Sequence, residues 1–529
     1  MIERFKNFIS RLEAINIGFG LWLATALGII LIRDGLESLV SLGAFPIPDL
    51  FHLLHVPIFF ISLFLAIILV LHFFSGVEII KVSRVGLVFF SIILLPVLLD
   101  FFISLAVKRD VVYQYIMEEP GKNFLLFLNP FVRLSQITFS LRVEIACITI
   151  LSFIYIRLKR NRFWISLLGA FCVFALCVFY GSIPAVLTEL TVSFFRFLIF
   201  MSRFIYLNLP SKLMGVVDES VVVIIQLLLT FILLMIWFWR YDARKSRALW
   251  RNFRWMRVSH YILLVLMGVV LYFYDVRDEN LFILFKIIGT SLAMFFACQF
   301  CAVTNDIFDK EGDRISNRDR PLVAGALSEG EYLKVGFVYL ALALCFAVWV
   351  SGTCLTILLS FIALYFIYSA PPFRLKRFYP LNPVIIGIEA VLAFLLGQMS
   401  LAPQDHQMPF YPSTLGLLFV IFLLSSHIKD LKDIEGDRAA KVLTLPVLLG
   451  KDRARRISAA FVFLSYLLAP FLFSFIFYRA FIFALAFLFG AANFFYIRKQ
   501  DSREKFIFAT YLIFGTILLA LLIQAVFFS

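Results

Sequence analysis

The chain has 529 residues, of which 62% are hydrophobic and 16% are charged, whereas soluble domains are about 25% charged. Apolar runs of about 20 residues recur along its length, and each is long enough to cross the hydrocarbon of a bilayer. Because these runs are continuous rather than alternating, they favour membrane helices over a barrel and exclude a soluble globular protein. Basic loops held in the cytoplasm account for the formal net charge of +14, so we expect no nucleic-acid partner.

The first 240 residues are expected to form a transmembrane domain of unknown role. Residues 1–16 carry both charge signs, and the apolar run after them lacks a signal-peptide cleavage site. Residues 109–142 are mixed in composition and are expected to lie along the membrane interface. The expected spans are near residues 15–33, 52–75, 85–107, 143–158, 163–187 and 219–239, with 189–208 as a candidate seventh.

A basic segment over residues 241–257 follows, and we interpret it as an interfacial linker. Arg and Lys side chains together with tryptophans suit the headgroup zone of a membrane. The basic residues in or beside this segment are Arg240, Arg244, Lys245, Arg247, Arg251, Arg254 and Arg257, and the tryptophans are Trp237, Trp239, Trp250 and Trp255.

The rest of the chain, residues 258–529, is expected to contain nine spans. These lie near residues 258–274, 281–303, 331–350, 353–369, 384–400, 413–428, 456–477, 479–497 and 507–528. The loops on the linker's side are rich in Arg and Lys, and those on the other side carry few. The positive-inside rule therefore places the linker and the basic loops in the cytoplasm.

Two short acidic stretches, residues 305–313 and 430–437, are the most informative feature of the chain. Each directly follows a membrane-length apolar run, and both fall on the side assigned to the cytoplasm. Carboxylates are costly near hydrocarbon, so acid gathered at two membrane exits requires a positive partner. If the stretches are helical, each presents one polar stripe. The stripes are Asn305, Asp309 and Asp313 in the first stretch, and Asp430, Asp433 and Asp437 in the second.

Oxygen ligands with few His or Cys residues nearby favour Mg²⁺ over zinc or copper. Because Mg²⁺ prefers a few carboxylates together with phosphate oxygens, the implied substrate is a phosphate or diphosphate ester. Basic side chains beside such a site would neutralise a leaving diphosphate. Those near the two stretches are Lys310, Arg314, Arg318 and Arg320, and, in the loop between them, Arg374, Lys376 and Arg377.

Three ordered motifs resemble the signatures of the UbiA superfamily of intramembrane prenyltransferases. The first is NDIFDKEGD at 305–313 with NRDRPL at 317–322, and it resembles the first aspartate signature. The second, YSAPPFRLK at 368–376, resembles the Tyr/Lys loop. The third is KDLKDIEGDR at 429–438 with TLP at 444–446, and it resembles the second aspartate signature. The resemblance covers about residues 245–529 and leaves the N-terminal half unrecognised.

The resemblance implies an all-α polytopic membrane fold, with a nine-helix bundle around a cavity. It implies that Mg²⁺ grips a prenyl diphosphate and that the prenyl group passes to an aromatic or lipophilic acceptor. The implied metal ligands are Asp309, Asp313, Asp430, Asp433 and Asp437, with Asn305 as a further catalytic residue. The implied substrate-binding residues are Arg314, Arg320, Tyr368, Arg374, Lys376, Lys429 and Glu389.

Within the family, the motifs look nearest to the branches that act on geranylgeranylglyceryl phosphate, homogentisate and chlorophyllide. A related branch instead uses polyprenyl phosphate as the nucleophile towards phosphoribosyl diphosphate. We expect a multi-pass protein of a bacterial inner membrane, in contact with membrane lipid and with its active-site loops on the cytoplasmic side.

Some alternatives stay open. The carboxylates could serve a transporter or another cation-binding membrane protein, although transport sites usually lie near the bilayer midplane within repeated halves. Glu389 lies in the middle of a span, where it either binds the acceptor or accepts a proton, or is a neutral, hydrogen-bonded side chain. His427, one turn before Asp430, either assists the site or has no catalytic duty.

Overall fold

The computed structural model describes residues 2–42, 52–107, 139–205, 219–276, 282–402, 409, 411–473, 478–499 and 504–527. All regular elements in these ranges are helices. Fifteen of the described helices are long and apolar enough to cross a membrane. The predicted fold class, an all-α polytopic membrane protein, is therefore confirmed.

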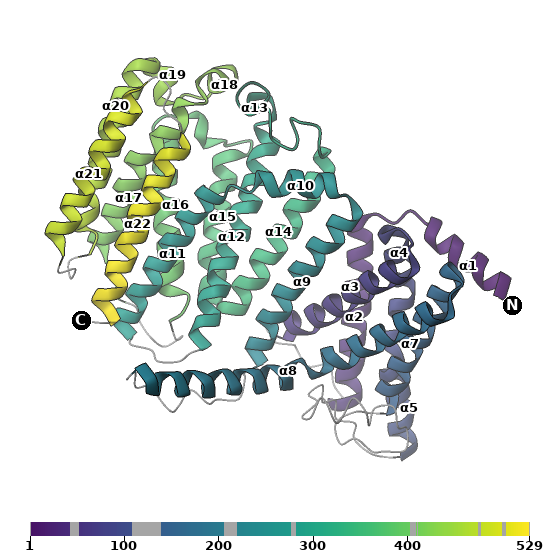
Figure 1. Cartoon of the computed structure of the whole chain (residues 1–529). Coiled ribbons are helices and arrows are strands. Elements are labelled where there is room, and N and C mark those ends of the chain that lie inside the picture. The colour runs from purple at the N-terminus through teal and green to yellow at the C-terminus, as the bar shows by residue number, and fades with distance from the viewer. Residues whose placement is uncertain are drawn as a thin grey trace. The chain divides into compact units, whose positions relative to one another are not determined.

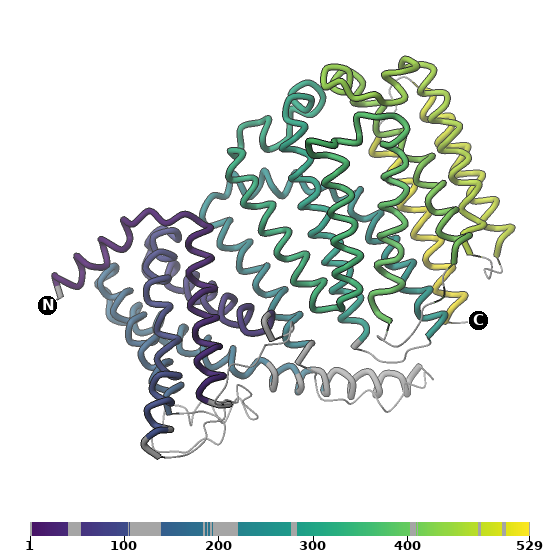
Figure 2. The backbone as a smooth tube through the Cα atoms, turned by 180° about the vertical axis from the view of Figure 1, so that it is seen from behind, coloured from purple at the N-terminus to yellow at the C-terminus, as the bar shows by residue number. Residues whose placement is uncertain are grey.

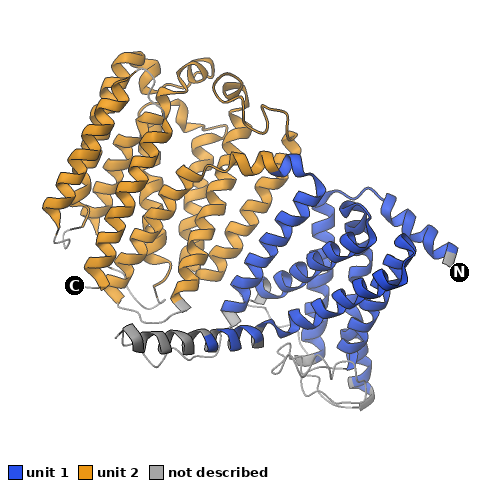
Figure 3. Ribbon diagram, in the orientation of Figure 1, with its two compact units in different colours: residues 1–246 blue, residues 247–529 orange. Residues whose placement is uncertain are grey.

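The chain divides into two compact units, residues 1–246 and 247–529 (Figure 3). The boundary falls inside the basic segment 241–257, part of which forms helix α10 (Ala243–Asn252). The interfacial position of this segment and the role of residues 1–240 remain predictions.

The first unit contains six of the membrane-length helical segments that the structure describes. Its elements are α1 (Ile2–Ala14), α2 (Phe19–Leu42), α3 (His52–Ser75), α4 (Ile79–Phe90), η1 (Ser91–Leu94), α5 (Leu95–Val107), α7 (Phe139–Arg160), α8 (Phe163–Ile205) and α9 (Glu219–Tyr241).

Two elements of the first unit differ from the expected spans. The span expected near 85–107 consists of α4, a 3₁₀ turn and α5, because Pro96 lacks an N–H and its ring blocks continuation of the helix behind it. Residues 189–205 of the candidate span near 189–208 belong to α8, which continues through Gly181 and Pro184. The expected interfacial segment 109–142 lies outside the described residues, except for 139–142 at the start of α7.

The second unit contains nine membrane-length helical segments in its described ranges, as expected. They are α11 (Trp255–Val276), α12 (Phe282–Phe308), α14 (Glu329–Val350), α15 (Gly352–Ser369), α16 (Leu381–Met399), α17 (Pro412–Ser425) with η4 (Ser426–Leu431), α20 (Lys451–Leu468) with η5 (Ala469–Phe471), α21 (Arg479–Arg498) and α22 (Glu504–Phe527).

The nine long helices run side by side, and short elements gather at one end of them (Figures 1 and 2). These short helices are α13 (Lys310–Ser316), α18 (Ile434–Ala439) and α19 (Leu445–Leu449), and the 3₁₀ turn η3 (Leu375–Arg377) lies in the α15–α16 loop. The acidic stretches and the Tyr/Lys loop belong to this end of the unit.

Helices α11 and α16 approach each other closely through glycine. A Cβ added to Gly268 would lie 2.1 Å from the carbonyl oxygen of Phe394, and one added to Gly397 would lie 1.9 Å from that of Val265. Only glycine leaves room for such an approach, which is how small residues pack membrane helices. The contact fixes the position of two helices that line the site described below.

Candidate active site

A cavity of about 260 Å³ lies inside the second unit, and residues from both acidic stretches line it. The stretches meet because α13 packs against α18. A Cβ on Gly436 would lie 3.1 Å from the carbonyl oxygen of Gly312 and 2.4 Å from the Ser316 hydroxyl oxygen. Glycine at 436 therefore permits the contact that brings the two acidic segments to one cavity.

The first stretch keeps a helical register although α12 ends at Phe308. The Asp309 amide donates to the Asn305 carbonyl at 2.8 Å, and the Asp313 amide donates to the Asp309 carbonyl at 2.9 Å. Asn305, Asp309 and Asp313 all line the cavity, as one polar stripe would.

The second stretch is less regular than a single helix. It begins in the 3₁₀ turn η4, and α18 starts only after Asp433. The Asp437 amide donates to the Asp433 carbonyl at 2.7 Å. Asp430, Asp433 and Asp437 nevertheless all line the cavity.

Asp309 pairs with the loop between α15 and α16. Lys376 Nζ lies 2.5 Å from both carboxylate oxygens of Asp309, and Arg374 donates to one of them at 2.9 Å. Burial opposes ionisation of Asp309, but Lys376 and Arg374 outweigh it, so the pKa of this carboxyl is lowered. Burial lowers the pKa of Lys376, while Asp309 acts in the opposite direction. Lys376 also donates to the Asn305 side-chain oxygen at 3.3 Å.

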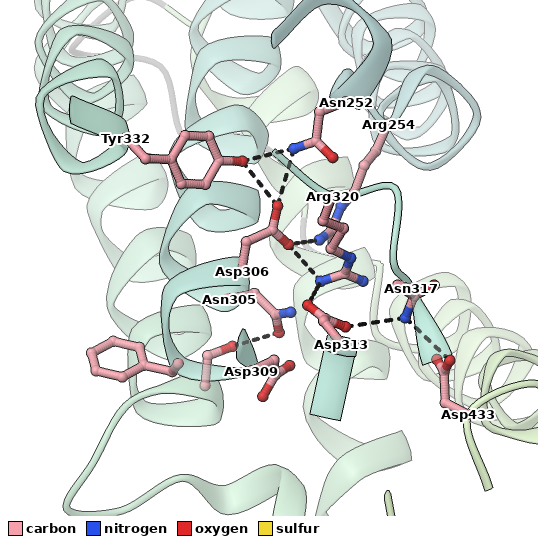
Figure 4. Close-up of polar contacts among 12 residues, drawn as sticks. Asn252, Arg254, Asn305, Asp306, Asp309, Asp313, Asn317, Arg320, Tyr332 and Asp433 are labelled. Atoms are coloured by element: carbon pink, nitrogen blue, oxygen red, sulfur yellow. Dashed lines mark hydrogen bonds and ion pairs between the residues drawn. The ribbon is translucent and has the colours of Figure 1, made fainter. Parts of the chain in front are cut away.

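Asp306 is the centre of a second cluster (Figure 4). It is 1% exposed. Arg254 and Arg320 donate to its Oδ1, the latter at 2.6 Å, while Asn252 and Tyr332 donate to its Oδ2 at 3.0 and 2.9 Å. The cluster holds Arg320 in place, and Arg320 reaches the cavity-lining acid described next.

Arg320 and Asn317 both donate to Asp313, Asn317 at 3.1 Å. Burial raises the pKa of Asp313 to about 6, against the pull of Arg320 and with the help of Asp306. Asn317 also donates to Asp433 at 3.3 Å (Figure 4). This amide therefore joins the two acidic stretches directly.

The second stretch is tied to the cavity by a chain of polar contacts. Lys429 Nζ donates to the Tyr368 hydroxyl at 2.8 Å, and that hydroxyl donates to the Asn382 oxygen at 3.0 Å. The Asn382 amide then donates to Asp430 at 3.3 Å. These hydrogen bonds link the ammonium group of Lys429 to the buried carboxylate of Asp430, at the place expected for a diphosphate.

Asp437 lies at the cavity together with two other carboxylates, those of Asp430 and Asp433. Thr444 donates to it at 3.2 Å. Burial raises its pKa to about 7, and the neighbouring Asp430 and Asp433 add to the rise. A bound cation would relieve this repulsion.

Most residues expected at the site line the cavity, and two do not. The lining includes Asn305, Asp309, Asp313, Arg320, Tyr368, Lys376, Glu389, Lys429, Asp430, Asp433 and Asp437. Arg374 contacts Asp309 from outside the lining. Arg314 lies outside the lining: its side chain is 57% exposed and pairs with Glu311 at 2.9 Å, so its expected contact with diphosphate stays a prediction. One residue beyond Asp313, it is turned by about 100° around α13 and leaves the cavity face.

Several polar residues around the site are not identified by the sequence motifs. Asp306 belongs to the first motif, but it is rotated off the Asn305 stripe, so the stripe gives it no role. Arg254 stands out in the sequence only as part of the basic linker. Asn382 was missed altogether, and its one signal was a lone amide at the edge of an apolar run.

The carboxylates suit a Mg²⁺ ion that also binds water and the phosphate oxygens of a substrate. They suit a metal site made of protein ligands alone less well. Among the described residues, no group of three or more His, Cys, Asp or Glu side chains is arranged to hold a metal ion. Mg²⁺ usually takes only one or two carboxylates, and waters and phosphate oxygens complete its shell. The carboxylates of Asp430, Asp433 and Asp437, which all line the cavity, would be candidates for such a shell.

Residues 261–520 match the model of the UbiA prenyltransferase family, and no family model matches the N-terminal half. The chain is 32% identical over 212 residues to a chloroplastic 2-acylphloroglucinol 4-prenyltransferase of Humulus lupulus, covering 36% of this chain and 49% of that protein. It is 29% identical over 181 residues to the digeranylgeranylglyceryl phosphate synthase of Methanocaldococcus jannaschii, covering 34% and 60%. The chain thus spans about half to three fifths of the length of these relatives. A solved UbiA homologue from Archaeoglobus fulgidus, bound to DMAPP and Mg²⁺, is similar with a TM-score of 0.41 and 20% identity, over 53% of this chain and 99% of that chain.

Proposed function

We propose, on the premise that residues 261–520 belong to the UbiA prenyltransferase family, that this protein is a Mg²⁺-dependent intramembrane prenyltransferase. It would move a prenyl group from a prenyl diphosphate to an aromatic or lipophilic acceptor. The observation that carries the proposal is that both acidic stretches and five cationic side chains line one cavity; the five are Arg254, Arg257, Arg320, Lys376 and Lys429. The names of the two relatives, a prenyltransferase and a digeranylgeranylglyceryl phosphate synthase, support the same reaction class.

One end of the cavity, here called the charged end, is lined by the two acidic stretches together with Arg320, Lys376 and Lys429. This charged end would bind the diphosphate. Mg²⁺ bound by the aspartates, with Asp433 and Asp437 as the first candidates, would supply positive charge to the leaving group. Lys376 and Lys429 are held there by hydrogen bonds, so their charges are already positioned, as preorganised electrostatic stabilisation requires. Arg320, fixed by Asp306, would steady Asp313 beside them.

The apolar part of the cavity would protect the reacting prenyl group. Its walls include Phe361, Tyr365, Phe422 and Tyr511. Breaking the C1–O bond leaves an allylic cation, and walls of this kind exclude the water that would consume it. Aromatic faces also stabilise a nearby positive charge.

We also propose that the charged end of the bundle faces the cytoplasm of a bacterial inner membrane. The support is the excess of Arg and Lys in the loops at this end, which the positive-inside rule assigns to the cytoplasm. Membrane lipid would surround the bundle and give the apolar substrates access to it.

The test uses the purified full-length protein in lipid nanodiscs with Mg²⁺, labelled prenyl diphosphates of several chain lengths, and aromatic and lipid acceptors. We expect a prenylated product from the wild type and a loss of about 100-fold or more in Asp309→Ala and Asp433→Ala, because each removes charge stabilisation of the leaving group. Glu435→Ala, which changes an exposed acid of the second stretch, is the matched control and should retain activity. Near-normal turnover in either aspartate variant, or turnover unaffected by EDTA, would refute the proposal.

A further inference from the structure

The cavity extends well inward from its charged end. Three pairs of cavity-lining residues show this. In each pair, one residue lies near the acidic stretches and the other is seven residues away in the sequence, further into the bundle. Seven helical residues make two turns, or about 10 Å. The pairs are Arg254 and Tyr261, where Arg254 directly precedes α11 and its carbonyl accepts from Val258 of that helix, Asn305 and Cys298 on α12, and Asn382 and Glu389 on α16. Tyr261, Cys298 and Glu389 therefore mark an inner end of the cavity, about two turns from the diphosphate region.

Glu389 brings a carboxylate to this inner end. The residue is 2% exposed, and its Oε2 accepts a hydrogen bond from the Tyr261 hydroxyl at 2.8 Å. Its Oε1 is buried and has no hydrogen-bond partner in the structure. Buried polar atoms normally have a partner, and this one belongs to a residue that lines the cavity. A bound molecule is thus well placed to supply the missing donor.

The surroundings indicate what kind of molecule this is. The Tyr261 hydroxyl already donates its hydrogen bond to Glu389 Oε2. A hydrogen bond to Glu389 Oε1 therefore requires an O–H or N–H group of the ligand. A carboxylate or phosphate beside Glu389 would be repelled. The ring of Phe361 lies edge-on to Tyr261 at 5.3 Å between centroids, and Tyr365 also lines this region. The inner end therefore suits an apolar or aromatic body that carries a hydroxyl group.

We propose that this inner end is the acceptor subsite, that the acceptor is a lipophilic alcohol or phenol, and that Glu389 accepts its hydroxyl proton. The inference rests on the proposed prenyl transfer. In the step, the C1–O bond of the prenyl diphosphate breaks and its electron pair leaves with the diphosphate. A new bond forms between C1 and the acceptor oxygen, and the O–H proton passes to the Glu389 carboxylate. Tyr261 is a positioning residue that orients this carboxylate.

The experiment measures two reactions of the full-length protein. The first is Mg²⁺-dependent hydrolysis of prenyl diphosphate with no acceptor added, in which water takes the prenyl group and the products are the prenyl alcohol and free diphosphate. The second is prenyl transfer to 4-pentylphenol and to dodecanol, each compared with its methyl ether. For Glu389→Gln we expect transfer to fall by about 100-fold or more, as for removal of a general base, while diphosphate release stays within about twofold. Tyr261→Phe should show a smaller loss, and Glu435→Gln, an exposed acid outside the lining, should show none.

A second readout separates proton acceptance from a structural role. Added formate should restore part of the transfer in Glu389→Ala, because a small carboxylate can enter the space left behind. Transfer to the ethers as fast as to the hydroxyl compounds, diphosphate release with no transfer to any hydroxyl probe, or an unimpaired Glu389→Gln would each overturn the acceptor proposal and leave the proposed function standing. A wild type that neither releases diphosphate nor transfers would instead overturn the proposed function.

Discussion

Asp306 shows how a residue outside the cavity lining controls residues within it. Two guanidinium groups, one amide and one phenol all donate to its carboxylate. Because Asp306 is buried, this charge is stable only while those donors surround it. One of the guanidiniums, that of Arg320, also holds Asp313. Asp306 therefore links the packing of the bundle to the geometry of the first acidic stretch.

The first prediction concerns this buried acid. Asp306→Ala leaves Arg254 and Arg320 without their shared partner, and breaking a buried ion pair costs about 3–5 kcal/mol. We expect a clear fall in the thermal unfolding midpoint in detergent, followed by the reaction of a thiol-sensitive dye with buried cysteines such as Cys301. Glu311→Ala is the control, because Glu311 is 79% exposed and pairs with the exposed side chain of Arg314. Equal midpoints for the two variants would contradict this account of Asp306.

A second prediction separates two arginines of the same motif region. Arg320 is bound to Asp306 and Asp313 and has a side chain 17% exposed, whereas Arg314 projects away from the cavity. We expect Arg320→Ala to lower prenyl transfer by at least about tenfold, since charge-assisted hydrogen bonds to a buried carboxylate are lost. Arg314→Ala should change it by less than about twofold, because exposed ion pairs contribute little. The reverse order in measured kcat/KM would restore the role that the motif alone implied for Arg314.

The two arginines also show what sequence can supply at this scale. Motif spacing places the aspartates on one face, because helix geometry follows from residue number alone. The partners of those aspartates cannot be read in this way. Arg254 and Asn382 come from elements 52 and 48 residues distant from the acids they bind, and only packing decides which donors reach them.

At the scale of helices, the site depends on how closely α11 and α16 approach. Tyr261 on α11 donates to Glu389 on α16 across this contact. The glycines at 268 and 397 let the two backbones meet further along the same pair of helices. A shift of either helix would therefore separate a catalytic candidate from the side chain that orients it.

The third prediction tests that contact. Gly268→Ala places a methyl group 2.1 Å from a backbone oxygen of Phe394, which cannot move out of the way as a flexible side chain would. Overpacking of this kind costs about 1–3 kcal/mol or more. We expect a lower unfolding midpoint together with weaker prenyl transfer. Gly416→Ala is the matched control on α17, where a Cβ meets nothing within 4 Å, and it should keep or slightly raise stability. Equal behaviour of the two alanine variants would show that the α11–α16 approach is not tight.

The positions of the membrane spans follow from the lengths of the apolar runs and were predicted correctly. The breaks and turns within those spans depend on individual residues and were not predicted. The nine spans of the second unit follow from runs of about 20 apolar residues. The 3₁₀ turn at Ser426–Leu431 was not expected, since no proline or glycine marks it. In the first unit, the break before α5 could have been predicted from Pro96. The continuation of α8 through Gly181 and Pro184 could not have been predicted, because both residue types disfavour a helix interior.

For the whole molecule, composition and hydropathy predict a membrane protein and a basic segment near its middle, whereas the expectation of a cavity comes from the resemblance of the motifs alone. A cavity depends on side chains from helices far apart in the chain, and hydropathy carries no information on how those helices meet. The first unit has its own half-buried polar contacts. Glu13, for example, accepts hydrogen bonds from Tyr155 and Lys159 at 3.1 and 2.8 Å. Such contacts show that the unit is specifically packed, and they leave its role open.

The last prediction concerns orientation in the membrane. Helices α14 and α15 are joined by the single residue Ser351, so they run in opposite directions. The other end of α15 leads into the loop whose Lys376 pairs with Asp309. Its 18 residues span about 27 Å, which is close to the thickness of the hydrocarbon. The Ser351 turn and the acidic stretches should therefore face opposite sides of the membrane.

Single cysteines in a background lacking the seven native ones would measure this directly. In intact cells, an impermeant maleimide should label Thr353→Cys, beside the turn, and leave Arg318→Cys and Arg438→Cys unlabelled until the membrane is opened. All three positions are exposed on the protein, so a difference in labelling reports the membrane and not burial. The inverse pattern would overturn the cytoplasmic assignment alone. Labelling of all three from one side would show that α15 does not cross the bilayer, and the bundle could not then enclose an intramembrane site.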